Sequence, residues 1–181
     1  MAVQEKLYTV GEFLEVAQLP ENQNRRLELI EGEICEMPSS SSLNTTIAGL
    51  FVHYLNAYVV ERGLGYISTS DGGYELSPHE VRIPDAAFIA KERVSELGRA
   101  IFQAAPNLAV EVIVPGATAR MINDKVRVYL NAGRRWFGSS ILMKKLLTYG
   151  RLPVMTICWY GRSALMIHSM AARPCPDLRC R

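Results

Sequence analysis

The first part of the chain combines apolar positions at helical spacing with short runs typical of strands. Residues 9–19 show helical spacing and end before a proline, so they predict a helix. Residues 26–37 predict a hairpin that turns at Gly32. After a serine-rich loop, Ser42 is expected to cap a helix that runs to about Arg62. The inner face of this helix is expected to carry Leu43, Ile47, Leu50, Tyr54, Leu55 and Tyr58.

The middle of the chain reads as a series of strands. Residues 65–70 and 74–76 are extended runs on either side of the turn sequence Asp71-Gly72-Gly73. Residues 81–90 are expected to be extended before their proline. Residues 108–114 form a nearly continuous apolar run, which is typical of a central strand covered on both faces.

A further helix follows this central strand. Pro115-Gly116 breaks the apolar run, and residues 118–132 then show helical spacing that ends at Gly133. Strand, breaker, helix and a further strand form a crossover unit, which predicts an α/β fold with a mixed sheet. The inner side of the helix is expected to carry Met121, Ile122, Val126, Tyr129 and Leu130.

Composition narrows the class of protein. The chain has 181 residues, which is enough for one domain with a real core, and 49% of them are apolar against 21% charged. No apolar run is long enough for a membrane span, and the first residues do not resemble a secretion signal. The four cysteines are therefore expected to be thiols in a cytoplasmic protein.

The small net charge of +2 hides an uneven distribution of charge along the chain. Residues 1–115 carry 8 Lys and Arg against 16 Asp and Glu, whereas residues 116–181 carry 12 basic residues against only two acidic ones. Such asymmetry is consistent with an acidic metal-binding half and a basic half that binds nucleic acid. It is also consistent with two parts of different origin.

Two acidic residues stand out as candidates for a metal site. Glu111 interrupts the apolar run, where an unpaired carboxylate costs several kcal/mol unless it gains a cation, hydrogen bonds or a proton. Asp85 follows Pro84 in another expected strand. Each alone could be an ordinary strand-end residue exposed to solvent. Together, on neighbouring strands, they predict a hard-cation site of the kind that Mg²⁺ prefers.

Two further residues could complete this site. Lys125, on the following helix, could orient a nucleophilic water or balance charge in the transition state, although a lone lysine on a helix is usually just exposed. Tyr129 lies one turn later on the same face and could pack against the lysine stem. Glu28, in the hairpin, could supply another carboxylate or could be a surface residue.

Four segments in this order carry a resemblance to a known family. They are Glu-Leu-Ile-Glu-Gly-Glu at 28–33, Ile-Pro-Asp-Ala-Ala-Phe at 83–88, Leu-Ala-Val-Glu-Val at 108–112, and the segment from lysine to glycine at 125–133. Over residues 8–133 the chain resembles the Uma-two family of endonucleases, in the PD-(D/E)XK restriction-endonuclease-like superfamily. The resemblance implies a restriction-endonuclease-like central mixed sheet flanked by helices, and metal-dependent hydrolysis of phosphodiesters.

The resemblance also implies roles for individual residues. It makes Asp85 and Glu111 the metal ligands, with Glu28 assisting. The superfamily's usual lysine would stand at Ile113, two residues after the acidic ligand, but this branch takes it from the next helix, at Lys125. The chain departs from the family at two places: Asn44 stands where a histidine is common, and Val114 where a serine is common.

The C-terminal part of the chain does not fit the family pattern. Residues 138–181 contain 7 Lys and Arg against one acidic residue, with three of the four cysteines and four of the seven methionines. Tryptophan and methionine each have a single codon. When the implied codons are read one nucleotide earlier, the codon of Trp136 therefore forces valine at the position of Phe137, and the codon of Met143 forces glutamate at the position of Lys144. Codon degeneracy then permits the strand and acidic turn that the family would have there. We therefore expect a nuclease-like domain at 1–137 and a basic tail at 138–181 that follows a frameshift near residues 133–135.

The nucleotide sequence of the gene tests the frameshift. We expect the earlier reading frame to continue the family pattern past residue 135. A gene whose earlier frame encodes nothing like that strand and turn would remove the hypothesis, and the basic tail would then be a selected feature of the protein.

The sequence as a whole predicts an endonuclease that uses Mg²⁺ or Mn²⁺ and acts on nucleic acid, with DNA the expected substrate. Asp85 and Glu111 would hold the ion, and Lys125 would act beside it. The alternatives are a catalytically impaired relative that only binds nucleic acid, and an unrelated metal-dependent hydrolase on the same scaffold. The target site and a homodimeric assembly are left open.

Overall fold

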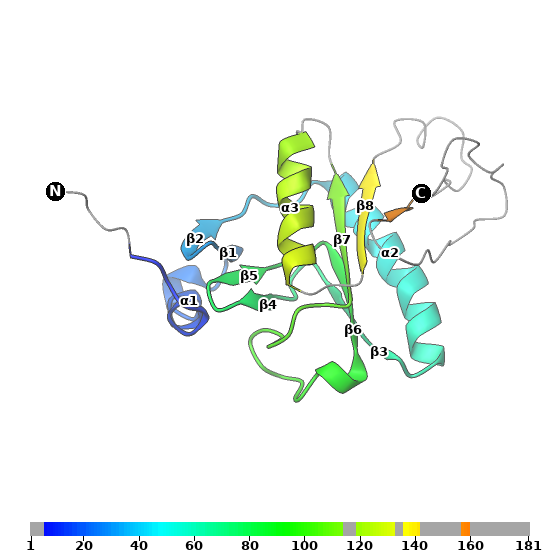
Figure 1. The fold of residues 1–181 in the computed structure, drawn as a ribbon, viewed down its shortest axis with the longest axis horizontal. Helices are drawn as coiled ribbons and strands as arrows, with labels where there is room; N and C mark the ends of the chain where they lie inside the picture. Colours follow the sequence, from blue (N-terminus) through cyan, green and yellow to red (C-terminus); the bar gives the residue numbers. More distant parts are fainter. Residues whose placement is uncertain (1–5, 114–118, 133–135, 142–156, 160–181) are drawn as a thin grey trace.

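Two β-sheets and three helices make up the described part of the chain (Figure 1). The computed structural model describes residues 6–113, 119–132, 136–141 and 157–159. A small antiparallel sheet contains, in spatial order, β2 (Glu33–Glu36), β1 (Leu27–Ile30), β5 (Glu80–Arg82) and β4 (Tyr74–Ser77). The larger sheet contains β3 (Gly65–Thr69), β6 (Ala86–Ala90), β7 (Leu108–Ile113), β8 (Trp136–Ile141) and β9 (Ile157–Trp159).

The larger sheet is mixed, as the sequence predicts. β7 pairs in parallel with β8, whereas the pairs β3–β6, β6–β7 and β8–β9 are antiparallel. The parallel pair is joined through α3 (Ala119–Asn131), which makes the expected crossover unit. The α/β fold class is therefore confirmed, and β7 is a central strand between β6 and β8.

The N-terminal elements form where the sequence predicts them. α1 (Val10–Ala17) begins at a capping box between Thr9 and Glu12, and a 3₁₀ turn (Pro20–Asn22) follows it. The hairpin β1–β2 turns at Glu31 and Gly32, which both have positive φ, as a tight hairpin requires. Phe13 of α1 packs against the small sheet, in a core with Leu27, Leu29 and Val81.

α2 (Ser42–Glu61) begins one residue earlier than expected and buries a face that agrees only in part with the expected one. Ser41, rather than Ser42, is the N-cap and accepts a hydrogen bond from the backbone of Asn44. Leu55 is buried and Ile47 packs on the same cluster, as expected, but Tyr54 and Tyr58 are exposed. Apolar residues occur all around this helix, so spacing alone cannot select the face that meets the sheet. The buried side chains are Ala48, Phe51, Leu55 and Val59.

The strands after α2 are divided between the two sheets. The turn after β3 forms, with the Gly72 N–H donating to the Thr69 carbonyl at 3.0 Å, but β3 and β4 do not pair and belong to different sheets. The expected strand 81–90 is divided into β5 and β6 at Ile83-Pro84-Asp85. The chain thus passes from the larger sheet to the small one between β3 and β4, and returns to the larger sheet between β5 and β6.

α3 covers the other face of the larger sheet. Val126 and Tyr129 are buried against Ala109 of β7, as expected, and Leu76 of β4 packs on the same cluster. Met121 was expected inside but is 60% exposed, because it lies two turns before these contacts. The side chains of Ile122 and Leu130 lie outside the described residues.

Most of the predicted tail lies outside the described residues. β8 extends across the domain boundary expected at residue 137, and of the remaining tail only β9 is described. The frameshift stays a prediction. Among the helices that the structure describes, none is both long and apolar enough to cross a membrane.

The packing of α2 can be tested with two variants on the same helix. Phe51→Ala should lower the free energy of unfolding by about 3–5 kcal/mol, because it empties a buried site against Val110 and Ala86. Tyr54→Ala, on the face expected from the sequence, should change it by no more than about 0.5 kcal/mol. Urea unfolding of both variants measures this, and equal losses would contradict the observed face.

Candidate functional site

β7 directs Glu111 toward α3 because side chains alternate along a strand. Val110 packs against α2, while Ala109 packs against α3. Glu111 shares the face of Ala109, so it lies under α3 in the centre of the larger sheet. Glu111 is only 8% exposed. A carboxylate this deeply buried needs partners from the elements around it.

The break between β5 and β6 brings Asp85 beside Glu111. Ala86 pairs with Val110 and Ala87 with Ala109, so continuing this register by one residue sets Asp85 opposite Glu111. Asp85 is 6% exposed, and its Oδ2 accepts a hydrogen bond of 2.7 Å from the backbone N–H of Val112. The carboxylate of Asp85 thus continues the hydrogen bonding of β7 where the backbone of β6 has ended.

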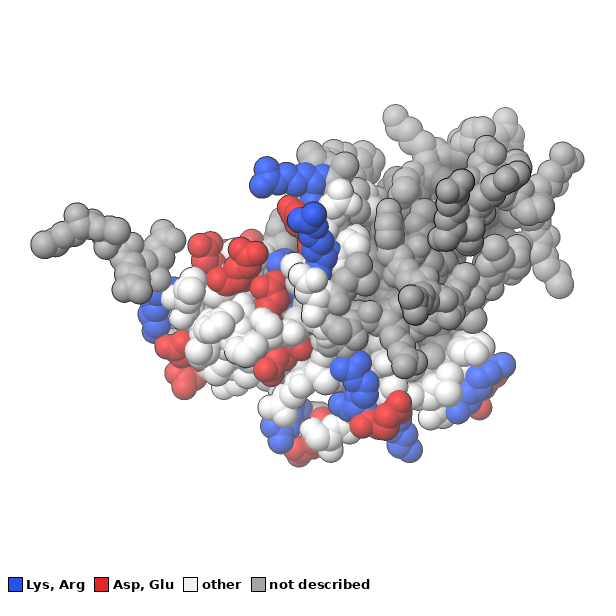
Figure 2. All heavy atoms as spheres, viewed as in Figure 1, with Lys and Arg blue, Asp and Glu red and all other residues white. Residues whose placement is uncertain are grey.

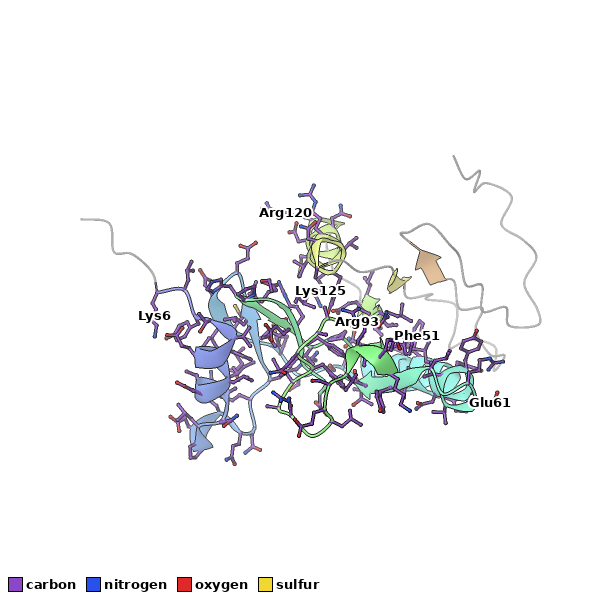
Figure 3. All side chains as sticks on the ribbon, turned by 60° about the horizontal axis from the view of Figure 1, so that its bottom comes forward. Lys6, Phe51, Glu61, Arg93, Arg120 and Lys125 are labelled. Atoms are coloured by element: carbon purple, nitrogen blue, oxygen red, sulfur yellow. The ribbon has the colours of Figure 1, made fainter. Side chains whose placement is uncertain are left out.

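α3 supplies a donor to each oxygen of Glu111. The Lys125 Nζ lies 2.6 Å from Glu111 Oε2, and the Tyr129 hydroxyl donates to Oε1 at 3.1 Å. The two donors are four residues apart and therefore lie on one face of the helix. The Lys125 side chain is 39% exposed, whereas Tyr129 is 1% exposed. Figure 3 labels Lys125 on α3, above the strands.

The small sheet adds a buried ion-pair network that contains Glu28. Arg82 contacts the carboxylates of Glu28 at 3.3 Å and Glu80 at 2.5 Å. Glu28 also accepts a hydrogen bond from the backbone N–H of Ile83 at 3.0 Å. Glu28 is 2% exposed, which excludes the surface-residue alternative. Its two oxygens face the chain segment that leads from β5 to Asp85.

The electrostatics of these groups are coupled. Burial raises the pKa of Glu111, the positive charge and hydrogen bond of Lys125 oppose this, and the negative charges of Asp85 and Glu28 add to it. Burial also raises the pKa of Tyr129, and Glu111 and Glu28 raise it further. The Tyr129 hydroxyl therefore keeps its proton at neutral pH and remains a donor to Glu111.

The network leaves an excess of negative charge. Its buried carboxylates are Glu28, Glu80, Asp85 and Glu111, against Arg82, Lys125 and the guanidinium of Arg26, which donates to the Ile83 carbonyl at 2.8 Å. With all groups ionised, four negative charges against three positive ones leave a charge of −1. A buried excess of this size favours either proton uptake, to which Glu111 is disposed, or a divalent cation.

The donor set suits a cation that keeps much of its hydration. Within the described residues, no three side chains of His, Cys, Asp or Glu gather in a way that could hold a metal ion. Asp85 and Glu111 are thus a pair, which is a sufficient protein contribution for Mg²⁺, because Mg²⁺ usually retains several waters and binds one or two carboxylates. These two residues therefore fit such an ion.

The four residues predicted from the sequence meet in one region, but with different partners. Asp85, Glu111 and Lys125 lie together, while Glu28 is held by Arg82. Sequence reasoning missed Arg82, and it gave Tyr129 a packing role instead of a hydrogen bond. The four-residue spacing between Lys125 and Tyr129 was the available signal for the second of these.

The superfamily's usual lysine position and the two departures from the family pattern have different structural outcomes. Ile113 lies two residues after Glu111 on the same face of β7, and its side chain carries no charge. Asn44 lies in the first turn of α2, and its side-chain Oδ1 is buried without a hydrogen-bond partner among the described residues. Val114 lies outside the described residues.

Comparison with solved structures supports the same fold. The chain is similar to the crystal structure of a putative nuclease belonging to DUF820 from Anabaena variabilis, with a TM-score of 0.60 and 21% sequence identity. The match covers 72% of this chain and 72% of that one. At this level of identity, the similarity establishes the fold alone. Among curated proteins, none matches the chain.

A family profile also matches more than half of the chain. Residues 12–135 match Uma2, the family described as "Putative restriction endonuclease". The match includes Glu28, Asp85, Glu111 and Lys125, and its range of 12–135 agrees closely with the resemblance seen over residues 8–133.

The raised pKa of Glu111 predicts a pH dependence of stability. Because Glu111 is protonated more readily in the folded chain than in the unfolded one, it favours folding below its ordinary pKa of 4.5, and this contribution is lost as the pH rises through the folded-state value. In Glu111→Gln, which cannot titrate at this position, the free energy of unfolding should therefore decline less with rising pH than in wild type. Urea unfolding of both proteins without divalent cations, from pH 4 to 8 in steps of about one unit, measures it. Parallel pH profiles would contradict the prediction.

Proposed function

Because the chain belongs to the Uma2 family, described as "Putative restriction endonuclease", we propose that it is an endonuclease that hydrolyses phosphodiester bonds in DNA with the help of Mg²⁺ or Mn²⁺. Asp85 and Glu111 are the proposed metal ligands, and Lys125 is the proposed catalytic lysine. The proposed nuclease domain comprises residues 1–137, which includes the whole of the family match.

One observation carries this proposal above the others. Two buried carboxylates belong to neighbouring segments, Asp85 just before β6 and Glu111 in β7, and the register of the two strands, continued by one residue, sets them opposite each other in a network rich in acidic groups. Two carboxylates brought together at the expense of stability are typical of a site that is built for a cation.

A divalent cation supplies two things to phosphodiester hydrolysis: it lowers the pKa of water in its coordination shell, and it neutralises charge on the phosphate. The chain's own residues do the rest. Asp85 and Glu111 fix the position of the site on the central strands. Lys125, partly exposed beside Glu111, can donate to a phosphate oxygen and balance the charge that develops there.

Glu28 acts less directly than the sequence suggested. Its carboxylate is engaged by Arg82 and by the backbone of Ile83. These contacts support a role in holding the segment that precedes Asp85, and its negative charge adds to the attraction for a cation. Glu28 thereby assists the site without being one of its ligands.

The surface around α3 suits the approach of a polyanion. Arg120, Lys125 and Arg127 lie along this helix, and Figure 2 shows basic side chains over it, whereas acidic side chains gather around α1 and the small sheet. Phosphate groups are attracted to the basic side and repelled from the acidic one. DNA would therefore approach the site from the side of α3.

A second candidate function is that of a catalytically impaired relative that binds DNA without cutting it. The specific observation in its favour is Asn44, whose amide stands in place of the family's common histidine and has a buried oxygen without a partner. Such a protein would keep the basic surface of α3 and lose hydrolysis.

A cleavage assay separates these functions. Supercoiled plasmid is incubated with Mg²⁺ or Mn²⁺ and with wild type, Asp85→Asn or Lys125→Ala. We expect wild type to convert the plasmid to nicked or linear forms, and both variants to lose at least about 100-fold in rate, as is usual for lost charge stabilisation. Arg99→Ala, an exposed substitution away from the site, is the matched surface control and should cut like wild type.

The outcomes distinguish the proposals. Cleavage by wild type that persists in Asp85→Asn would contradict the assigned site. A gel shift without cleavage, weakening steeply with salt, would favour the DNA-binding relative. If wild type neither cleaves nor binds DNA in the presence of Mg²⁺ or Mn²⁺, both proposals are contradicted.

A further inference from the structure

We propose that Tyr129 is a positioning residue that orients Glu111 for metal binding through its hydroxyl group. The proposal rests on the function proposed above and concerns the same site. The observation behind it is the 3.1 Å hydrogen bond from the Tyr129 hydroxyl to Glu111 Oε1, inside a fully enclosed cluster.

The two donors to Glu111 differ in how firmly they are held. Lys125 has a long flexible side chain and is 39% exposed, so its ammonium can exchange between Glu111 and solvent or substrate. Tyr129 is 1% exposed and packs against Ala109 and Val126, with Leu76 of the small sheet beside them. Its ring therefore holds the hydroxyl in one place, and this donor stays with Glu111 when Lys125 leaves.

The hydroxyl of Tyr129 is not needed for packing. A phenylalanine ring would fill the same space among Ala109, Val126 and Leu76, and it would avoid placing a polar group in this cluster. What the hydroxyl adds is a direction for the Glu111 carboxylate. Partners of this kind, which hydrogen bond to a metal ligand without touching the metal, typically change metal affinity 10–100-fold when they are removed.

The position of Tyr129 connects the site to the rest of the fold. Its hydroxyl lies in the field of Glu28 and Arg82 as well as of Glu111. Tyr129 is thus the point at which α3, the central strand and the small sheet meet. Its hydrogen bond fixes Glu111 relative to all three.

The chain offers a matched control for a test of this hydrogen bond. Tyr74 of β4 is 0% exposed, and its hydroxyl is hydrogen bonded at 2.7 Å to the hydroxyl of Ser68 in β3, whereas the described hydrogen bonds of Asp85 and Glu111 go to other groups. Tyr74→Phe and Tyr129→Phe remove the same atom from equally buried sites. They differ in the group that loses its partner.

The test measures Mn²⁺ binding by the intact protein, from the electron paramagnetic resonance signal of the free ion. We expect Tyr129→Phe to bind Mn²⁺ 10–100-fold more weakly than wild type, and Tyr74→Phe to bind it like wild type. In the plasmid assay, the Mn²⁺ concentration that gives half-maximal cleavage should rise for Tyr129→Phe. The cleavage rate of Tyr129→Phe at saturating Mn²⁺ should fall by a smaller factor than the factor by which this Mn²⁺ concentration rises.

Each other outcome decides against the proposal. Equal Mn²⁺ affinity of Tyr129→Phe and wild type overturns the role of Tyr129 and leaves the proposed function intact. If Tyr74→Phe loses as much Mn²⁺ affinity as Tyr129→Phe, the affinity follows the general stability of the protein. A Tyr129→Phe variant that does not fold would lead to the same conclusion. Absence of Mn²⁺ binding by wild type overturns the proposed metal-dependent function and this proposal together.

Discussion

The structure depends on one constraint, which is the placement of a carboxylate in the middle of the central strand. Glu111 is surrounded by apolar neighbours, and its charge can be kept there only if the surrounding elements supply partners. α3 supplies Lys125 and Tyr129, while the end of β6 adds the like charge of Asp85. A helix of the same length without these two donors would cover the sheet equally well but would leave Glu111 unpaired. The crossover helix therefore both completes the fold and sustains the site.

The junction between the two sheets completes the arrangement. In the short passage from β5 to β6 the chain leaves one sheet and enters the other, with Arg82 on one side of Pro84 and Asp85 on the other. Proline ends the first strand because it lacks an N–H group, and the Asp85 side chain then satisfies the N–H of Val112 in the second sheet. The segment between β5 and β6 therefore has two roles, since the same residues connect the sheets and carry the charges of the site.

Much of this could be predicted from local patterns. Three predictions rest on short segments: the strand around Glu111, the extended segment before the proline that precedes Asp85 and the helix that carries Lys125. The structure contains all three. The buried face of α2 could not be predicted, because a helix that is apolar all around takes its orientation from the sheet. Strand pairing was also out of reach: the turn after β3 is correct, but β3 pairs with β6, whereas β4 pairs with β5 in the other sheet. The contact of Arg82 with Glu28, 54 residues apart, has the same cause.

The parallel pairing of β7 with β8 has a consequence for how the protein is made. Until β8 has been synthesised, the central strand β7 has a neighbour on one side only, among the strands that the structure describes. A chain shortened before β8 would expose this strand as an open edge, and such edges pair readily with other copies and aggregate. Residues 136–141 thus protect the solubility of the nascent chain, whatever their origin.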